Sequence, residues 1–217
     1  MDKPPVISFC ELTGNAVRPW ADAGYPCYIV DMQHPRGVTR SNHPNITRIG
    51  ANIYELHPYH MWLPQADRFA IGMAWPDCTH FAYSGARWRR DNGPMATAEG
   101  FRLFAACWDL LQFYERERGA AWLLENPKGI PWSWSKPDFV FHPWQYGDNE
   151  SKETGIWCGG KFVMPPPSVV LKPTDVKQSV WYAPPGPERV NLRSATSTGF
   201  ARAVFEANEP LIRERAA

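Results

Sequence analysis

The chain has 217 residues, of which 44% are hydrophobic and 21% are charged, with 22 prolines and 11 tryptophans. These proportions are close to those of soluble globular proteins and exclude a disordered, collagen-like or coiled-coil chain. The formal net charge is only +1, so contact with a polyanion would require a local basic patch. The length predicts one compact domain over residues 1–217.

The cysteines show neither the spacing of a disulfide framework nor that of a zinc site. They are Cys10, Cys27, Cys78, Cys107 and Cys158. The first residues contain no apolar stretch long enough for a signal peptide, and no run of about 18 apolar residues occurs in the chain. The sequence therefore predicts a cytoplasmic protein with reduced thiols, no bound metal and no membrane contact.

The first elements in chain order predict a β-α-β unit. A short apolar run at Val6–Cys10 is followed by a turn at Gly14, a helical pattern, and a second apolar run at Tyr28–Val30 that ends in Asp31. In α/β proteins such a turn lets the backbone approach an adenosine, and the acid accepts hydrogen bonds from the ribose hydroxyls. The alternative is structural: Gly14 ends a turn and Asp31 caps a strand.

The middle of the chain predicts a connection, a strand and a helix. Residues 38–64 are polar and rich in His and Pro, with at most one short strand at 46–53. The apolar run at 69–74 predicts a strand that delivers Cys78 at its carboxyl end, the edge where open α/β sheets place their chemistry. Apolar residues recur at three- and four-residue steps over 96–118, which predicts a helix.

A further buried strand is predicted at 121–124, and Glu125 follows it on the same sheet edge as Cys78. A thiol and a carboxylate would therefore converge. The structural alternatives are a buried thiol for Cys78 and a capping role for Glu125, although burying an unpaired acid is costly.

The last third of the chain predicts two short strands, a loop and a helix. The strands, expected to be antiparallel, lie at 139–141 and 155–158, a proline-rich loop spans 165–193, and the helix covers 198–207. Together the elements predict an α/β fold with a mixed, mostly parallel sheet and helices on both faces.

Five segments resemble, in order and approximate spacing, the motifs of the cytosine-5 DNA methyltransferases. They read FCELTGNAVRPWADAGY, PDCTHFAYSGARW, LLENPKG, QYGDNESKETGIW and STGFARAVFEA. The resemblance is to the short phage and prophage members and covers roughly residues 6–207, with the weakest fit at 38–64 and 165–193. It implies the Rossmann-like fold of the methyltransferases that use S-adenosylmethionine.

The resemblance implies that Cys78 adds as a thiolate to carbon 6 of cytosine, which makes carbon 5 nucleophilic enough to accept a methyl group. Glu125 would assist at ring nitrogen 3, and Asn126 and Pro127 would hold Glu125 in place. The family usually offers an arginine to the base from the element near Gln145, and this chain has none there. Arg87 and Lys152 are the candidates for this cation, and we favour Arg87 as the fourth catalytic residue.

The resemblance also implies a cofactor site and a substrate site. Thr13 and Gly14 would face the methionine part of S-adenosylmethionine, Asp31 its ribose and Asn52 its adenine amino group. The cofactor-binding residues would be Phe9, Glu11, Thr13, Gly14, Asp31, Asn52 and Pro76. The substrate-binding residues would be Thr79, Ser84, Arg89, Gln145 and Lys152.

Two positions depart from the family pattern. Asp77 stands before the cysteine where the family usually has proline, and a negative charge there is expected to raise the thiol pKa. Glu11 and Leu12 occupy a turn that is usually small or glycine-rich, which would reshape the donor pocket. Arg87, Arg89 and Arg90 would meet phosphates beside the base, or form a solvated surface run.

The segment 165–193 leaves no room for the long target-recognition region of larger family members. DNA is therefore expected as the partner with relaxed specificity, or with a protein partner that supplies recognition. The alternatives are a free cytosine nucleotide as substrate, transfer of a group other than methyl, or a catalytically silent member that binds DNA or a partner. The family suggests a role in protecting phage DNA from restriction in the host cytoplasm.

Overall fold

The computed structural model describes residues 3–169, 173–176 and 195–216. Its strands are β1 (Val6–Phe9), β2 (Cys27–Val30), β3 (Gly37–Arg40), β4 (Ile46–Gly50), β5 (Ile71–Ala74), β6 (Ala121–Pro127), β7 (Phe139–Phe141) and β8 (Thr154–Gly159). Its α-helices are α1 (Arg18–Asp22), α2 (Arg89–Arg118), α3 (Pro131–Trp134) and α5 (Thr198–Ala216). Short 3₁₀ helices lie at η1 (Ile53–Glu55), η2 (Tyr83–Trp88), η3 (Pro143–Tyr146) and η4 (Pro173–Asp175).

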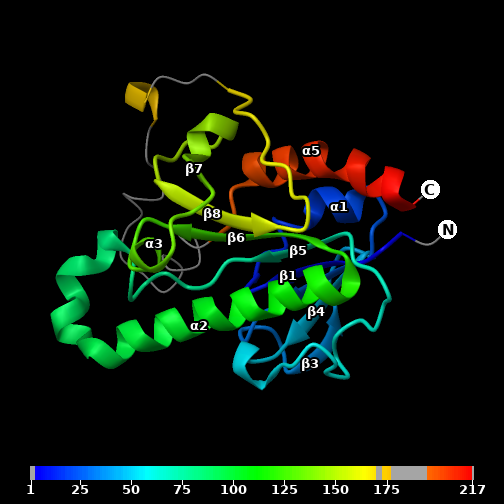
Figure 1. Cartoon of the computed structure of the whole chain (residues 1–217), viewed down its shortest axis with the longest axis horizontal. Coiled ribbons are helices and arrows are strands. Elements are labelled where there is room, and N and C mark those ends of the chain that lie inside the picture. The colour runs from blue at the N-terminus through cyan, green and yellow to red at the C-terminus, as the bar shows by residue number, and fades with distance from the viewer. Residues whose placement is uncertain (1–2, 170–172, 177–194, 217) are drawn as a thin grey trace.

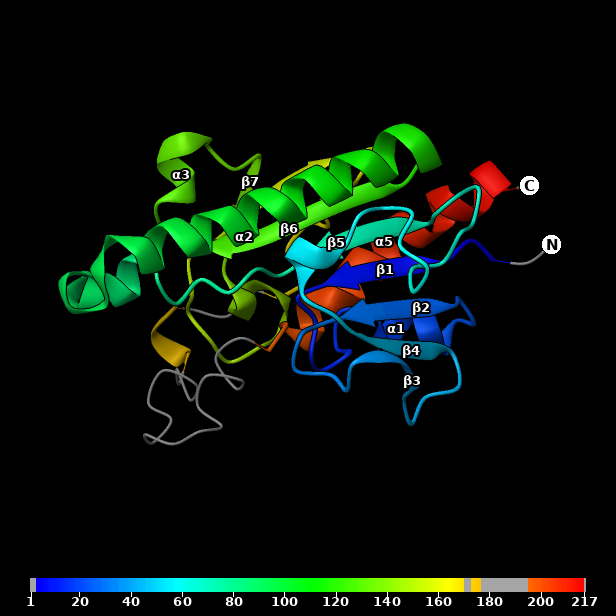
Figure 2. The same cartoon turned by 90° about the horizontal axis from the view of Figure 1, so that it is seen from below.

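The strands form one sheet in the order β3-β4-β2-β1-β5-β6-β8-β7 (Figures 1 and 2). The pairs β1–β2, β1–β5, β2–β4 and β5–β6 are parallel, and β3–β4, β6–β8 and β7–β8 are antiparallel. From β1 the chain builds outward through β2 and β4, then returns to β5 and β6 on the other side. The strand order thus reverses between β1 and β5, the switch point where open α/β sheets bind ligands.

Helices cover both faces of the sheet, because successive strand residues point to opposite sides. Val6 of β1 packs in the core layer with Trp20 of α1 and Phe200 of α5, whereas its neighbour Ile7 packs in the layer that contains Phe104 of α2. Figure 2 shows α2 crossing one face while α1 and α5 lie on the other. The predicted α/β class, with a mostly parallel mixed sheet compatible with a Rossmann-like fold, is confirmed.

Several element boundaries differ from the prediction. The connection at 38–64 contains two strands rather than at most one, because β3 is a polar edge strand without an apolar signal. Helix α2 begins at Arg89 instead of residue 96 and is kinked at Gly93, whose φ is 77°. The part before the kink projects beyond the sheet (Figures 1 and 2). Helix α5 runs on to Ala216 instead of ending at 207.

The expected proline-rich loop at 165–193 lies mostly outside the described residues. Of this segment, 165–169 and 173–176 are described. The amides of Ser168 and Val169 both donate to the carbonyl of Gln145 at 3.0 Å, so the described start of the loop is held against η3.

Candidate functional site

A cavity of about 650 Å³ lies at the carboxyl ends of four neighbouring strands, over the switch point. Its wall includes Glu11 and Thr13 after β1, Asp31 after β2, Asn52 after β4 and Asp77 after β5. Four of these, all except Asp77, are among the residues predicted to bind the cofactor. The structure brings them to one cavity because the parallel strands all end at the same edge.

The Glu11 carboxylate is buried and holds the turn after β1. Its Oε1 accepts hydrogen bonds from the Thr13 amide at 3.0 Å, the Thr13 hydroxyl at 2.6 Å and the Gly14 amide at 2.7 Å. Its Oε2 accepts from the hydroxyl of Thr196 at 3.2 Å. The unusual Glu11 therefore fixes the turn internally and ties it to the segment that precedes α5.

Two polar side chains follow β2 and β4 at the far wall of the cavity. Asp31 accepts a hydrogen bond from the Gln33 amide at 2.8 Å, and burial raises the pKa of its carboxyl group. Asn52 caps η1, with its side-chain oxygen accepting from the Tyr54 amide at 3.1 Å. Both side chains are held in place by local backbone bonds.

Three further residues predicted to bind the cofactor lie outside the cavity wall. Phe9 is fully buried, with its ring centroid 6.0 Å from that of Tyr114. Gly14 is buried beneath the turn, with a φ of 80° that favours glycine. Pro76 is also buried, and its carbonyl accepts from the side-chain amide of Asn126 at 3.0 Å.

The loop after β5 carries Cys78 beside the cavity. Asp77 is exposed and accepts hydrogen bonds from the Thr79 amide at 3.0 Å and the Thr79 hydroxyl at 2.6 Å, which fixes the turn around the cysteine. Burial raises the pKa of the Cys78 thiol, the charges of Glu125 and Asp77 raise it further, and the charge of Lys152 lowers it. Burial and the two carboxylates therefore favour the protonated thiol, whereas Lys152 favours the thiolate.

Glu125 lies next to this loop because β6 extends beyond the end of its parallel neighbour β5. The β5–β6 ladder ends at Leu124, whereas the antiparallel ladder with β8 continues through Pro127. The Glu125 side chain is 13% exposed, and its Oε1 lies 3.6 Å from the ammonium nitrogen of Lys152. Fully buried Asn126 donates to the carbonyl of Pro76, which joins the end of β6 to the Cys78 loop.

The remaining predicted catalytic and substrate residues are distributed around this loop. Arg87 and Ser84 are exposed on η2, where the Arg87 guanidinium stacks over Trp88 at 5.0 Å from its centroid. The Arg89 guanidinium is turned inward and donates to the carbonyl of Phe81 at 2.7 Å. Arg89 therefore closes the Cys78 loop. Of the two candidate cations, Lys152 is the one that forms an ion pair with Glu125.

Gln145, also predicted to bind the substrate, is used within η3. Its side-chain oxygen accepts from the His142 amide at 2.7 Å and forms a capping box. Asp148, three residues later, accepts from the Thr198 hydroxyl at 3.3 Å and from the Gly199 amide at 2.9 Å. The Gln-Tyr-Gly-Asp segment thereby anchors the start of α5.

The cavity residues that sequence reasoning missed include two groups from distant parts of the chain. One is a face of α2 formed by Ala96, Glu99, Gly100 and Leu103, at helical spacing. That spacing is visible in the sequence, but it is equally typical of a helix face that packs in the hydrophobic core. The other is Thr196 together with Ala195. Nothing in the sequence indicates that Thr196 returns to bond with Glu11.

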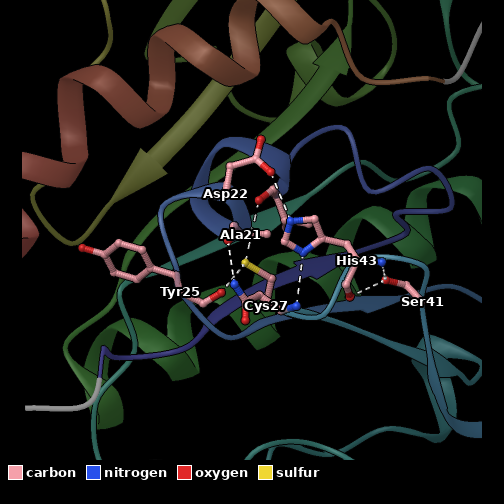
Figure 3. Close-up of polar contacts among 8 residues, drawn as sticks. Ala21, Asp22, Tyr25, Cys27, Ser41 and His43 are labelled. Carbon is pink, nitrogen blue, oxygen red and sulfur yellow. Dashed lines mark hydrogen bonds and ion pairs between the residues drawn. The ribbon is translucent and has the colours of Figure 1, made fainter.

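A second polar cluster lies at the amino ends of β2 and β4, away from the cavity at their carboxyl ends (Figure 3). This cluster is structural. The Nε2 of His43 lies 3.1 Å from an Asp22 carboxylate oxygen, and its Nδ1 accepts from the Asn45 amide at 3.1 Å. The Ser41 hydroxyl bonds the backbone of His43 and not its ring. The arrangement therefore lacks the serine–histidine contact of a hydrolase triad and fixes the turn between β3 and β4.

All five cysteines are free thiols, and those of Cys10 and Cys107 lie 3.7 Å apart near the cavity. Within residues 3–169, 173–176 and 195–216, no group of three or more His, Cys, Asp or Glu side chains is arranged to hold a metal ion. The same part of the chain contains no helix long and apolar enough to cross a membrane. No protein-family model matches the chain, and no curated protein matches it in a sequence search.

Proposed function

We propose that this protein transfers a methyl group from S-adenosylmethionine to carbon 5 of cytosine in DNA, with Cys78 as the nucleophile. The observation that carries the proposal is the meeting of three groups next to the cavity. Cys78 lies on the loop after β5 and Glu125 lies on β6, and the 3.0 Å bond from Asn126 to Pro76 joins these two segments. Lys152 lies 3.6 Å from Glu125. A thiol, a carboxyl and an ammonium group are the set that addition to a pyrimidine ring needs.

The cavity fits the proposed methyl donor in position and in charge. It lies where α/β sheets hold adenosine ligands, with Asp31 after β2 available to the ribose hydroxyls and Asn52 available to the adenine. Among the described lining residues, four are acidic and none is Lys or Arg. Such a wall disfavours the phosphates of a dinucleotide and favours a ligand with a positive charge.

The donor, when bound, supplies an electrophilic methyl group on its sulfonium sulfur. The Cys78 thiolate would add to carbon 6 of the base while Glu125 shares a proton with ring nitrogen 3, so that the electron pair is placed on carbon 5. Carbon 5 would then take the methyl group. Loss of the carbon 5 proton to solvent and departure of the thiolate would restore the aromatic ring and the free enzyme.

Lys152 has two roles in this proposal. Its charge opposes the effect of burial on the Cys78 thiol and so favours the thiolate, and it balances the charge of Glu125 in the free protein. We therefore assign to Lys152, instead of Arg87, the cation beside the base. Arg87, on the exposed η2 with Trp88, remains available for contact with DNA phosphates.

Transfer of labelled methyl groups tests the proposal. The protein is incubated with S-adenosylmethionine carrying a tritiated methyl group and with either duplex DNA, single-stranded DNA or free dCMP, followed by nucleoside digestion and chromatography. We expect label in 5-methylcytosine from DNA, and none with Cys78→Ser. Label only in dCMP would move the substrate to free nucleotides, and no label with any acceptor would contradict the proposal.

A further inference from the structure

The carboxylates of the cavity wall differ in how far hydrogen bonds or a neighbouring cation offset their negative charge. Glu11 is saturated by the hydrogen bonds described above, and Glu99 lies 3.5 Å from the guanidinium of Arg102. Asp31 and Asp77 are bonded to neutral donors, and neither forms an ion pair within the part of the chain that the structure describes. Because they accept fewer hydrogen bonds than Glu11 and have no ion pair like that of Glu99, these two side chains present the least compensated negative charge to a ligand.

Of the two, Asp77 is the one at the reaction centre. It lies in the cavity wall at the end of β5 and directly precedes Cys78. Its negative charge raises the pKa of Cys78 and that of Asp31. Asp77 therefore acts electrostatically on both the nucleophile and the far wall of the cavity. Both bonds from Thr79 fix one carboxylate oxygen, Oδ1.

We propose that Asp77 is a specificity-determining residue of this site, which selects the positively charged sulfonium donor over its uncharged thioether product. The inference rests on the proposed function. S-adenosylmethionine and S-adenosylhomocysteine share the adenosine and the amino acid and differ in one methyl group and one positive charge at sulfur. A carboxylate beside that sulfur attracts the donor by charge and gives the product no such attraction, which favours product release.

Calorimetric titration of both ligands without DNA tests this inference. For Asp77→Asn, which keeps the oxygen that accepts from Thr79, we expect the preference for S-adenosylmethionine over S-adenosylhomocysteine to fall about fivefold. Asp77→Glu should retain the preference. Glu99→Gln is the matched control, because Arg102 already balances that charge, and it should leave the preference unchanged.

Asp31→Asn distinguishes a charge effect from a general loss of binding. Because Asp31 is assigned to the ribose, which both ligands share, its replacement should weaken both affinities by a similar factor. If Asp77→Asn leaves the ratio of the two affinities unchanged, whether or not both affinities fall, the inference is overturned while the donor site remains intact. Absence of binding of either ligand to the wild-type protein would instead overturn the proposed function and the inference with it.

Discussion

Replacement of Glu11 tests how the turn over the cavity is built. In Glu11→Ala, the Gly14 amide and the Thr196 hydroxyl lose a charged acceptor in a buried environment. Each such loss costs about 1.5–3 kcal/mol, and water that enters from the cavity recovers part of it. We therefore expect the free energy of unfolding to fall by about 2–4 kcal/mol, and the melting temperature by roughly 2–4 °C per kcal/mol.

Glu11→Gln should cost only about 1 kcal/mol, because an amide oxygen still accepts from Thr13 and Gly14 and the amide nitrogen can donate to Thr196. Glu55→Ala is the control: its exposed ion pair with Arg36 is expected to contribute less than about 1 kcal/mol. Urea denaturation followed by circular dichroism measures all three. Equal stability of Glu11→Ala and wild type, or equal losses for the Ala and Gln variants, would refute the reasoning.

Three further outcomes follow from the structure. Because burial raises the pKa of Cys78, kcat/KM should rise with pH beyond neutrality, and Lys152→Met should move that rise to higher pH; a pH–rate profile unchanged by Lys152→Met would contradict this. Burial also raises the pKa of Asp31, so donor affinity should weaken as pH falls through a value above the ordinary aspartate range, and calorimetry should show no such dependence for Asp31→Asn. Gly199→Ala should lower the free energy of unfolding by more than about 2 kcal/mol, since its Cβ would overlap the Tyr146 carbonyl oxygen; wild-type stability in urea would contradict this.

The strands that the sequence predicts well are those formed by continuous apolar runs. The runs that become β1, β2, β5 and β6 are buried on both faces, and parallel pairing leaves few alternatives for them. Strand β3 could not be found in this way. It pairs with β4 at the edge of the sheet and alternates between half-buried and exposed residues, so its pairing depends on the neighbour more than on its own composition.

The candidate site is predictable where it depends on strand ends. Asp31, Cys78 and Glu125 each follow an apolar run, and a parallel sheet brings such positions to one edge. Contacts between distant segments carry no such signal. The bonds from Thr196 to Glu11 and from Asn126 to Pro76 depend on how loops fold back, which periodicity does not encode.

Side-chain roles around the loop after β5 were also beyond prediction. The sequence groups Arg87, Arg89 and Arg90 as one basic run, but the Arg89 guanidinium turns inward to backbone carbonyls while Arg87 stays exposed. Similarly, the sequence offers both Lys152 and Arg87 as the cation beside the base, and the prediction favours Arg87. Only the antiparallel partner strand β8, which follows Lys152, brings that residue close to Glu125.

The most direct test of the central claim is a covalent trap at Cys78. DNA in which every cytosine is replaced by 5-fluorocytosine is incubated with the protein and S-adenosylmethionine, because fluorine blocks the elimination that releases the enzyme. Peptide mass spectrometry is expected to find a methylated fluorocytosine adduct on Cys78, absent from Cys78→Ser and from reactions without donor. DNA binding without any adduct would contradict the assignment of Cys78 as the nucleophile.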